Sequence, residues 1–226
     1  MCIRDSPYTI PEKELSFFKR LHLSADTLHR YGFEDNDEFN AFRYTDYTFE
    51  KFMEKARQQP WFSNTLFVFV GDHGLPGNAD ALYPNCWREL SLTRHHVPLL
   101  FYAPGWLPPS LRSDVCSQLD IMSSIATLLQ QPYTNTGMGQ SLFASTRPNR
   151  QGVFTIDHEL GTYGIITDST YYQQHRRTGK ESWVNTHHNH PLPASPRNDS
   201  LRRQMAQLTD AYYQVSKYML YNNKRK

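Results

Sequence analysis

Two adjacent side chains with metal-binding chemistry follow an apolar run. Asp72 offers a carboxylate oxygen and His73 an imidazole nitrogen, separated from the run Leu66–Val70 by Gly71 alone. Oxygen and nitrogen donors together form a normal mixed ligand set for Zn²⁺ or Mn²⁺. Gly74 follows the pair and would relax the turn that brings both side chains to one ion. The alternative is a polar strand end whose aspartate caps the backbone, and the tripeptide alone does not decide between them.

Two continuous apolar runs are the elements that would position this pair. Residues 65–70 and 97–102 are branched and aromatic, without polar alternation. Such runs are typical of central strands covered on both faces. In open α/β sheets, ligands bind outside the carboxyl ends of strands, which is where Asp72 and His73 fall.

Helical periods surround these strands. Apolar residues recur at three- and four-residue spacings over 39–56, 120–129 and 201–221, which predicts three helices. Residues 35–37 offer N-cap side chains for the first of them. Shorter helical pieces are expected at 12–21 and 87–92. Residues 152–156, 163–166 and 170–173 predict an antiparallel hairpin edge, and residues 175–200 a loop. The order predicts an α/β layer structure without internal repeats.

Composition excludes several classes of protein. The chain has 226 residues, of which 38% are hydrophobic and 14% aromatic, with a net charge of +2. These values do not fit a disordered chain or a broad basic face for nucleic acid. Three cysteines exclude a disulfide-built miniature fold, although Cys86 and Cys116 could pair in an oxidising compartment. No apolar run approaches the roughly 20 residues that cross a bilayer.

The beginning of the chain does not read as the start of a domain. Residues 1–6 lack the charged start and apolar run of a signal peptide, and they lead directly into a proline-braced extended segment. We therefore expect a non-native start at 1–6 and a missing natural N-terminal part. The alternative is an ordinary disordered terminus.

Four ordered blocks resemble the sulfatase-type branch of the alkaline phosphatase superfamily. They are residues 64–74, 96–105, 117–129 and 135–142. Their amino-acid sequences are most similar to those of the lipoteichoic acid synthase and phosphoglycerol transferase group. The resemblance implies an alkaline phosphatase-like fold with a central, largely parallel sheet flanked by helices, incomplete at the N-terminus. Residues 7–174 would then be the C-terminal part of the catalytic domain, followed by the loop 175–200 and a terminal helix with a basic tail over 201–226.

The same resemblance implies roles for individual residues. Asp72 and His73 match the family's metal-binding pair, and His96 matches a histidine that binds the substrate phosphate or supports the site. For His96 the alternative is an ordinary strand-edge histidine. Asp120 matches a family aspartate or caps its own helix, and Asp46 either orients groups near the site or reaches solvent, which we favour.

Departures from the family pattern bear on activity. The family's nucleophile is an upstream threonine preceded by an acidic metal ligand, and nothing before Asp72 matches either motif. Cys86 does not lie in the arylsulfatase nucleophile motif, so a packed, inert thiol is expected. No catalytic nucleophile is assigned in this chain, and we expect it to be inactive alone.

The intact family member is expected to transfer or hydrolyse phosphate or sulfate esters with a divalent metal. Mn²⁺ is the expected ion, with Zn²⁺, Mg²⁺ and Ca²⁺ as alternatives. The expected substrate is a phospholipid- or glycan-linked phosphoester outside the cytoplasm, in the periplasm or at the cell surface. Membrane anchoring is expected only through the N-terminal part. The competing hypotheses are a sulfatase and a non-catalytic metal-binding module.

A second histidine group lies in the expected loop. His187, His188 and His190 stand beside prolines without any period. Solvation or adventitious metal binding is the favoured interpretation.

Overall fold

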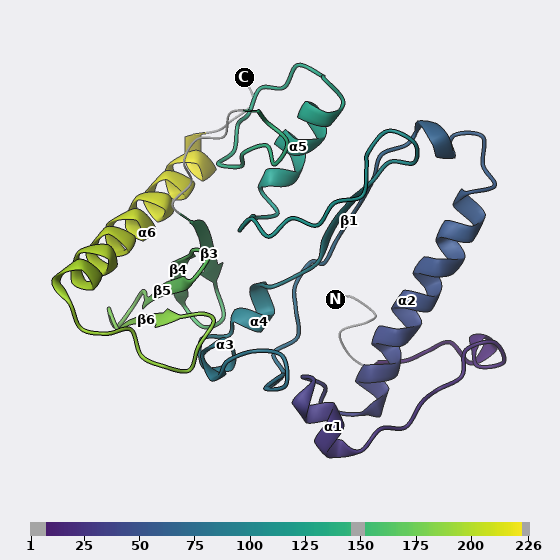
Figure 1. Cartoon of the computed structure of the whole chain (residues 1–226), viewed down its shortest axis with the longest axis horizontal. Helices are drawn as coiled ribbons and strands as arrows, with labels where there is room; N and C mark the ends of the chain where they lie inside the picture. Colours follow the sequence, from purple (N-terminus) through teal and green to yellow (C-terminus); the bar gives the residue numbers. More distant parts are fainter. Residues whose placement is uncertain (1–7, 146–151, 223–226) are drawn as a thin grey trace. The chain divides into compact units, whose positions relative to one another are not determined.

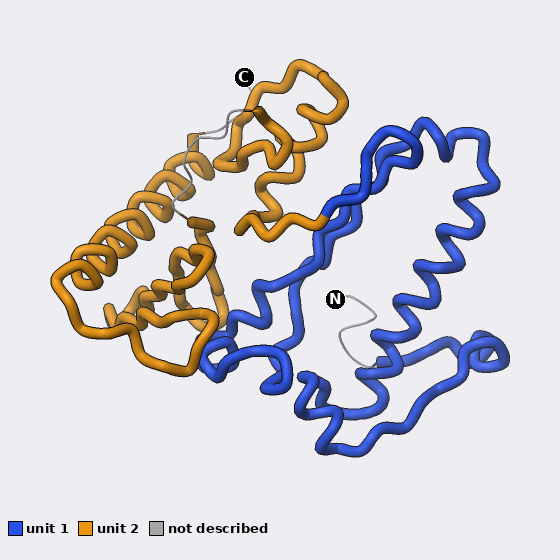
Figure 2. Tube along the Cα trace, viewed as in Figure 1, with its two compact units in different colours: residues 1–110 blue, residues 111–226 orange. Residues whose placement is uncertain are grey.

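A computed structural model describes residues 8–145 and 152–222. The chain divides into two compact units, residues 1–110 and 111–226 (Figure 2). Each unit contains helices and strands (Figure 1), and the predicted α/β class is therefore confirmed. The proposed non-native start and the basic tail Lys224–Lys226 lie outside the described residues. Among the described residues, no helix has the length and apolar composition needed to cross a bilayer.

Unit 1 is organised around one long helix. Its helices are η1 (Glu12–Glu14), α1 (Ala25–Arg30), α2 (Asn36–Ala56), η2 (Phe62–Asn64), α3 (Asn85–Glu89) and α4 (Leu92–His95). The side chain of Asp35 accepts hydrogen bonds from the backbone of Asp37 and Glu38, which confirms the predicted N-cap of α2. The helix expected at 12–21 is only the single turn η1; hydrogen-bonded turns to Glu14 O follow it as far as Phe18, but they do not extend into a regular helix.

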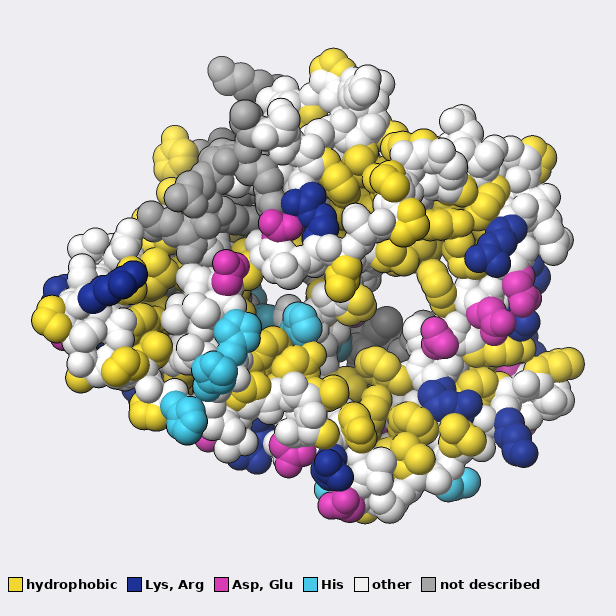
Figure 3. Space-filling model, viewed as in Figure 1, with side chains coloured by type: hydrophobic (Ala, Val, Ile, Leu, Met, Phe, Trp, Pro, Cys, Tyr) yellow, Lys and Arg dark blue, Asp and Glu magenta, His cyan; other side chains and the backbone are white. Residues whose placement is uncertain are grey.

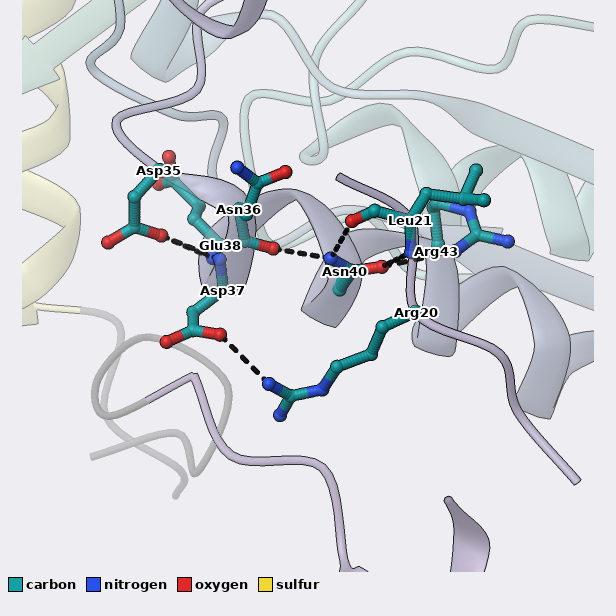
Figure 4. A network of polar contacts seen from close by, with 8 residues as sticks. All are labelled: Arg20, Leu21, Asp35, Asn36, Asp37, Glu38, Asn40 and Arg43. Atoms are coloured by element: carbon teal, nitrogen blue, oxygen red, sulfur yellow. Dashed lines mark hydrogen bonds and ion pairs between the residues drawn. The ribbon is translucent and has the colours of Figure 1, made fainter. Parts of the chain in front are cut away.

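Polar side chains on α2 hold the preceding segment in place (Figure 4). Asn40, 1% exposed, accepts from Leu21 N at 2.9 Å and donates to Leu21 O at 2.8 Å. Asn36 makes the same pair of bonds with Leu23. Each amide therefore satisfies one backbone donor and one acceptor, and the extended segment needs no strand partner.

The two apolar runs form β1 (Phe67–Val70) and β2 (Leu99–Tyr102), which pair in register from Phe67↔Tyr102 to Val70↔Leu99. The pairing is antiparallel, so the expected parallel orientation is wrong for these strands. Periodicity records which faces are apolar but not the direction of the partner, which explains the error.

One face of this ribbon is partly covered by α2. The rings of Phe49 and Phe69 meet edge to face with centroids 4.6 Å apart, and Phe52 contacts Phe67. Val70 is 43% exposed and Leu100 is 48% exposed. Hydrophobic side chains reach the surface of the molecule in several places (Figure 3). The expected covering of both faces is therefore not found within the part of the chain that the structure describes.

Unit 2 begins with α5 (Asp120–Leu128), which confirms the helix predicted from its apolar period. A loop returns over it and is bound to the helix by side chains. Asp120 accepts from Gln140 N at 2.8 Å, and Ser124 Oγ accepts from Leu142 N at 2.9 Å. Gly139 must lack a side chain, because a Cβ there would lie 1.8 Å from the carbonyl oxygen of Leu119.

A four-stranded antiparallel meander and a long helix complete unit 2. The elements are β3 (Val153–Asp157), β4 (Thr162–Ile166), β5 (Thr170–His175), β6 (Glu181–Asn185) and α6 (Pro196–Asn222). The predicted hairpin edge is confirmed, whereas the expected loop 175–200 contains β6 and the start of α6. Polar residues in β6 hid the strand, since Glu181 and Asn185 break the apolar pattern that identifies one.

One face of this sheet packs against α6. Ile165 and Tyr172 form a buried cluster with Met205, and the rings of Phe154 and Tyr212 stack with centroids 5.8 Å apart. The opposite face carries a buried polar group. Tyr171 Oη lies 3.1 Å from Thr155 Oγ1 and accepts from Gln173 Nε2 at 3.1 Å.

Burial of tyrosines makes unit 2 sensitive to alkaline pH. Burial raises the pKa of Tyr171 above its ordinary value of 10.0, and it also raises the pKa of Tyr163. An acid whose pKa is raised by folding stabilises the fold below its unfolded pKa, and this contribution is lost as the pH rises through the folded pKa. We expect the free energy of unfolding to fall above about pH 10, by up to about 1.4 kcal/mol per pH unit per tyrosine.

Urea unfolding at pH 8 and pH 10.5 measures this loss. Tyr171→Phe should be less stable at pH 8 by about 1 kcal/mol, since Thr155 and Gln173 lose a partner, but it should lose less on going to pH 10.5. Tyr218→Phe is the control, because this side chain is 68% exposed. An equal alkaline loss in wild type and Tyr171→Phe would contradict the role of this tyrosine.

Candidate active site

The loop after β1 carries the candidate metal pair and is held by contacts with the backbone segment that leads into β2. Gly71 N donates to Pro98 O at 3.1 Å, and Gly74 N donates to Arg94 O at 2.9 Å. A Cβ on Gly74 would lie 1.9 Å from Thr93 O and 3.1 Å from His96 O. Residues 71–74 therefore lie against the backbone that leads into β2, at a distance only glycine allows.

The rest of this loop is attached to the end of α1. Ala81 N donates to Arg30 O at 3.0 Å. A Cβ on Gly77 would lie 1.8 Å from Gly32 O, so the two backbones are in direct contact. Backbone contacts at both ends thus determine where Asp72 and His73 stand.

Both candidate ligands are exposed on this loop. Asp72 Oδ1 accepts from His73 N at 3.0 Å, and His73 Nδ1 lies 3.1 Å from Gly74 O. A carbonyl oxygen can only accept, so Nδ1 of His73 must carry the proton in this contact. The lone pair of His73 then resides on Nε2, which is the arrangement found in metal-bound histidines whose other nitrogen donates to a carbonyl.

His96 is the C-cap of α4 and lies three residues before the start of β2. Its Nδ1 lies 3.0 Å from the hydroxyl of Tyr83, and its ring meets that of Trp87 edge to face at 5.2 Å. Sequence reasoning missed Tyr83 and Trp87. Their separation of four residues around the start of α3 was the available signal, but helical neighbours of this kind usually report packing alone.

The donor set bears on whether a metal fits. Asp72 and His73 offer a hard oxygen and an imidazole nitrogen, as Mn²⁺ or Zn²⁺ requires. Within 8–145 and 152–222, however, no group of three or more His, Cys, Asp or Glu side chains is arranged to hold an ion. The pair therefore fits a metal as two ligands of a set, and two ligands alone make a weak site.

The other sequence candidates lie elsewhere. Asp46 is exposed on α2, as favoured from the sequence. Asp120 is 0% exposed and is not the N-cap of α5, a position held by Leu119; instead it binds backbone N–H groups. His187 Nε2 lies 2.6 Å from the backbone oxygen of Asp168, and no metal cluster forms around it in the described chain.

Cys86 and Cys116 form no disulfide in the described part of the chain, so the pairing considered from the sequence is not found. Cys86 is buried in unit 1, and burial raises the pKa of its thiol. A raised pKa lowers the thiolate fraction at neutral pH, which agrees with a packed, inert cysteine. Cys116 is exposed in unit 2.

Comparison with protein families gives a match over this site. Residues 21–131 match the Sulfatase family model. The matched segment contains Asp72, His73 and His96. It begins at the segment held by α2 and ends just after α5. Sulfatase-family enzymes use a divalent metal, so the donor chemistry of the loop agrees with the match.

Several solved structures have a fold similar to that of this chain. A 2-O GAG sulfatase matches with a TM-score of 0.58 at 17% identity, over 88% of this chain and 48% of that one. A putative sulfatase from Bacteroides thetaiotaomicron gives the same values. A phosphonate monoester hydrolase from Silicibacter pomeroyi matches with a TM-score of 0.51 at 15% identity, over 84% of this chain and 43% of that one.

These likenesses confirm the sulfatase and alkaline phosphatase-like fold that the sequence blocks predicted. The chain spans less than half the length of the solved structures that it matches. The neighbours include both sulfatases and a phosphonate monoester hydrolase, so the fold is shared across sulfur and phosphorus chemistry.

Proposed function

We propose that this chain supplies two metal ligands and one oxyanion-binding group to the active site of a metal-dependent phosphoester-cleaving or phosphoglycerol-transferring enzyme. The observation that carries the proposal is the loop Gly71–Gly74, which holds Asp72 and His73 against the segment leading to His96. The Sulfatase match over 21–131 supports it.

Each side chain has a distinct role in the proposal. Asp72 and His73 Nε2 hold the metal, and His96 binds a non-bridging oxygen of the ester. When bound, a divalent cation supplies charge neutralisation on the ester oxygens and lowers the pKa of a coordinated hydroxyl. His73 Nδ1 donates to Gly74 O, which keeps its ring in the orientation a ligand needs.

The proposed substrate is a phospholipid- or glycan-linked phosphoester, handled outside the cytoplasm by a membrane-anchored protein. The likeness of the four sequence blocks to the phosphoglycerol transferase group supports this. A sulfatase is the second candidate, because two of the matched structures are a sulfatase and a putative sulfatase. Both candidates use the same metal pair, so the test of that pair applies to either.

Titration of the full chain with Mn²⁺ tests the proposed ligands. We expect Asp72→Ala and His73→Ala each to weaken the affinity about tenfold, because each removes one of two donors from an already weak site. Asp46→Ala and His158→Ala are matched controls, since both side chains are exposed and neither belongs to residues 71–74. Calorimetry at pH 7 measures the dissociation constants.

Equal affinity in wild type and both loop variants would overturn the assignment of the metal pair. Loss of affinity in a control variant would show binding that is not confined to the loop. Manganese relaxation broadening of assigned amide signals around Gly71–Gly74 locates the ion independently of affinity.

A further inference from the structure

Three rings from separate positions of unit 1 meet beside the candidate site. The rings of Tyr83 and Trp87 stack with centroids 4.2 Å apart and planes inclined by 14°. The ring of His96 lies edge-on to both, with its centroid 5.2 Å from that of Trp87 and 5.8 Å from that of Tyr83. The hydroxyl of Tyr83 lies 3.0 Å from His96 Nδ1.

A tight backbone turn brings these rings to one corner. Trp87 lies on α3 and His96 caps α4, and the two short helices meet at Ser91. Ser91 has φ +56°, in the left-handed region that costs a non-glycine residue of order 1 kcal/mol. Trp87 N also donates to the backbone oxygen of Pro84, the residue that follows Tyr83, at 3.0 Å. The turn is therefore held in a tight conformation that places the three rings together.

The contact with Tyr83 determines which nitrogen of His96 carries a proton. A phenol hydroxyl is a better donor than acceptor, because its oxygen lone pair is delocalised into the ring. When Tyr83 donates to Nδ1, the neutral imidazole must carry its proton on Nε2. When the imidazole is doubly protonated, Nε2 again carries a proton. In both states Nε2–H is a donor, and a donor is what an anionic ester oxygen requires.

We propose that Tyr83 and Trp87 are positioning residues that hold His96 as an Nε2–H donor to a tetrahedral oxyanion, the phosphoryl or sulfuryl group of the substrate. This inference rests on the proposed function of the site. The stacked pair fixes the ring of His96 and the hydroxyl fixes its tautomer, so an exposed histidine is ordered before the anion arrives. In this proposal Tyr83 and Trp87 act through His96.

Two-bond ¹H–¹⁵N correlation spectra of the full chain test the tautomer directly. We expect neutral His96 to show the Nε2–H pattern in wild type. Tyr83→Phe keeps the stacked ring but removes the hydroxyl, and it should move His96 to a mixture of both tautomers. Tyr31→Phe is the control, because Tyr31 is 50% exposed and lies outside the cluster. An Nδ1–H pattern in wild type, or no change in Tyr83→Phe, overturns the positioning role.

Titration with inorganic phosphate, and separately with sulfate, tests the anion. We expect the His96 signals to shift with either ion, and Tyr83→Phe to weaken the apparent affinity about threefold to tenfold, which is the range for one lost hydrogen bond. Trp87→Leu should weaken it as well, by freeing the ring. If both ions leave His96 unmoved in wild type, the oxyanion role is wrong.

Failure here is distinguishable from failure of the proposed function. Manganese binding at Asp72 and His73 is measured separately, and neither Tyr83 nor Trp87 is a proposed ligand. A normal metal pair with an unmoved His96 would reject the positioning inference together with the oxyanion role of His96, and it would leave the metal-binding part of the proposed function standing.

Discussion

Replacing Asp120 with alanine is expected to lower the free energy of unfolding by about 3 kcal/mol. The carboxylate is 0% exposed and accepts from Ser117 N and from Gln140 N, each at 2.8 Å. Hydrogen bonds to a charged group contribute about 1.5–3 kcal/mol, and buried donors left without an acceptor cost about as much. Asp120→Asn keeps one acceptor oxygen, so we expect it to lose less.

Urea unfolding and amide hydrogen exchange measure this effect together. In Asp120→Ala, the Gln140 amide should exchange at least about tenfold faster, because a lost bond of 1.4 kcal/mol corresponds to a factor of ten. Asp46→Ala is the control, since its side chain is exposed on α2 and surface changes usually stay within about 0.5 kcal/mol. Unchanged exchange at Gln140 would show that another group holds the loop over α5.

Replacing Gly74 with alanine is expected to disrupt the candidate site as well as the fold of unit 1. The added methyl group would lie 1.9 Å from the backbone oxygen of Thr93, which cannot rotate away as a side chain would. The loop must move, and the bond from Gly74 N to Arg94 O is then strained or lost. Overpacking of this kind costs about 1–3 kcal/mol, and we expect the upper end of that range.

The site itself provides the second measurement on Gly74→Ala. Because the loop positions Asp72 and His73, the variant should bind Mn²⁺ about as weakly as His73→Ala. Gly137→Ala is a matched control: its added methyl group would approach nothing closer than 3.6 Å, the distance to Asn135 Oδ1. Wild-type stability and affinity in Gly74→Ala would mean that residues 71–74 are not fixed by the segment leading to β2.

Sequence patterns predicted the positions of helices and strands better than the pairing of the strands. The periods over 39–56 and 120–129 identified α2 and α5, because a helix makes its bonds locally and shows its apolar face at regular spacing. The runs at 65–70 and 97–102 identified β1 and β2 but not their antiparallel pairing. Strand direction depends on the path of the connection, which no local pattern records.

For the candidate site, too, the sequence predicted the residues but not their contacts. Asp72 and His73 were found from their residue types and their place after a strand. The glycine contacts that fix them were not, because the close approach of Gly74 to Thr93 becomes visible only when both segments are in space. Tyr83 and Trp87 were missed for the same reason, since their partner His96 follows α4 rather than α3.

The contrast between the two sheets has a consequence for the order of folding. Strands β3 to β6 are neighbours both along the chain and in the sheet, so each pairing closes only a short turn. The pairing of Val70 with Leu99 instead requires α3, α4 and the loops around them to be closed into one connection. Longer closures lose more chain entropy and slow the search for native contacts. We therefore expect the meander to form early and the ribbon late, so that the candidate metal loop becomes ordered only in the last steps of folding.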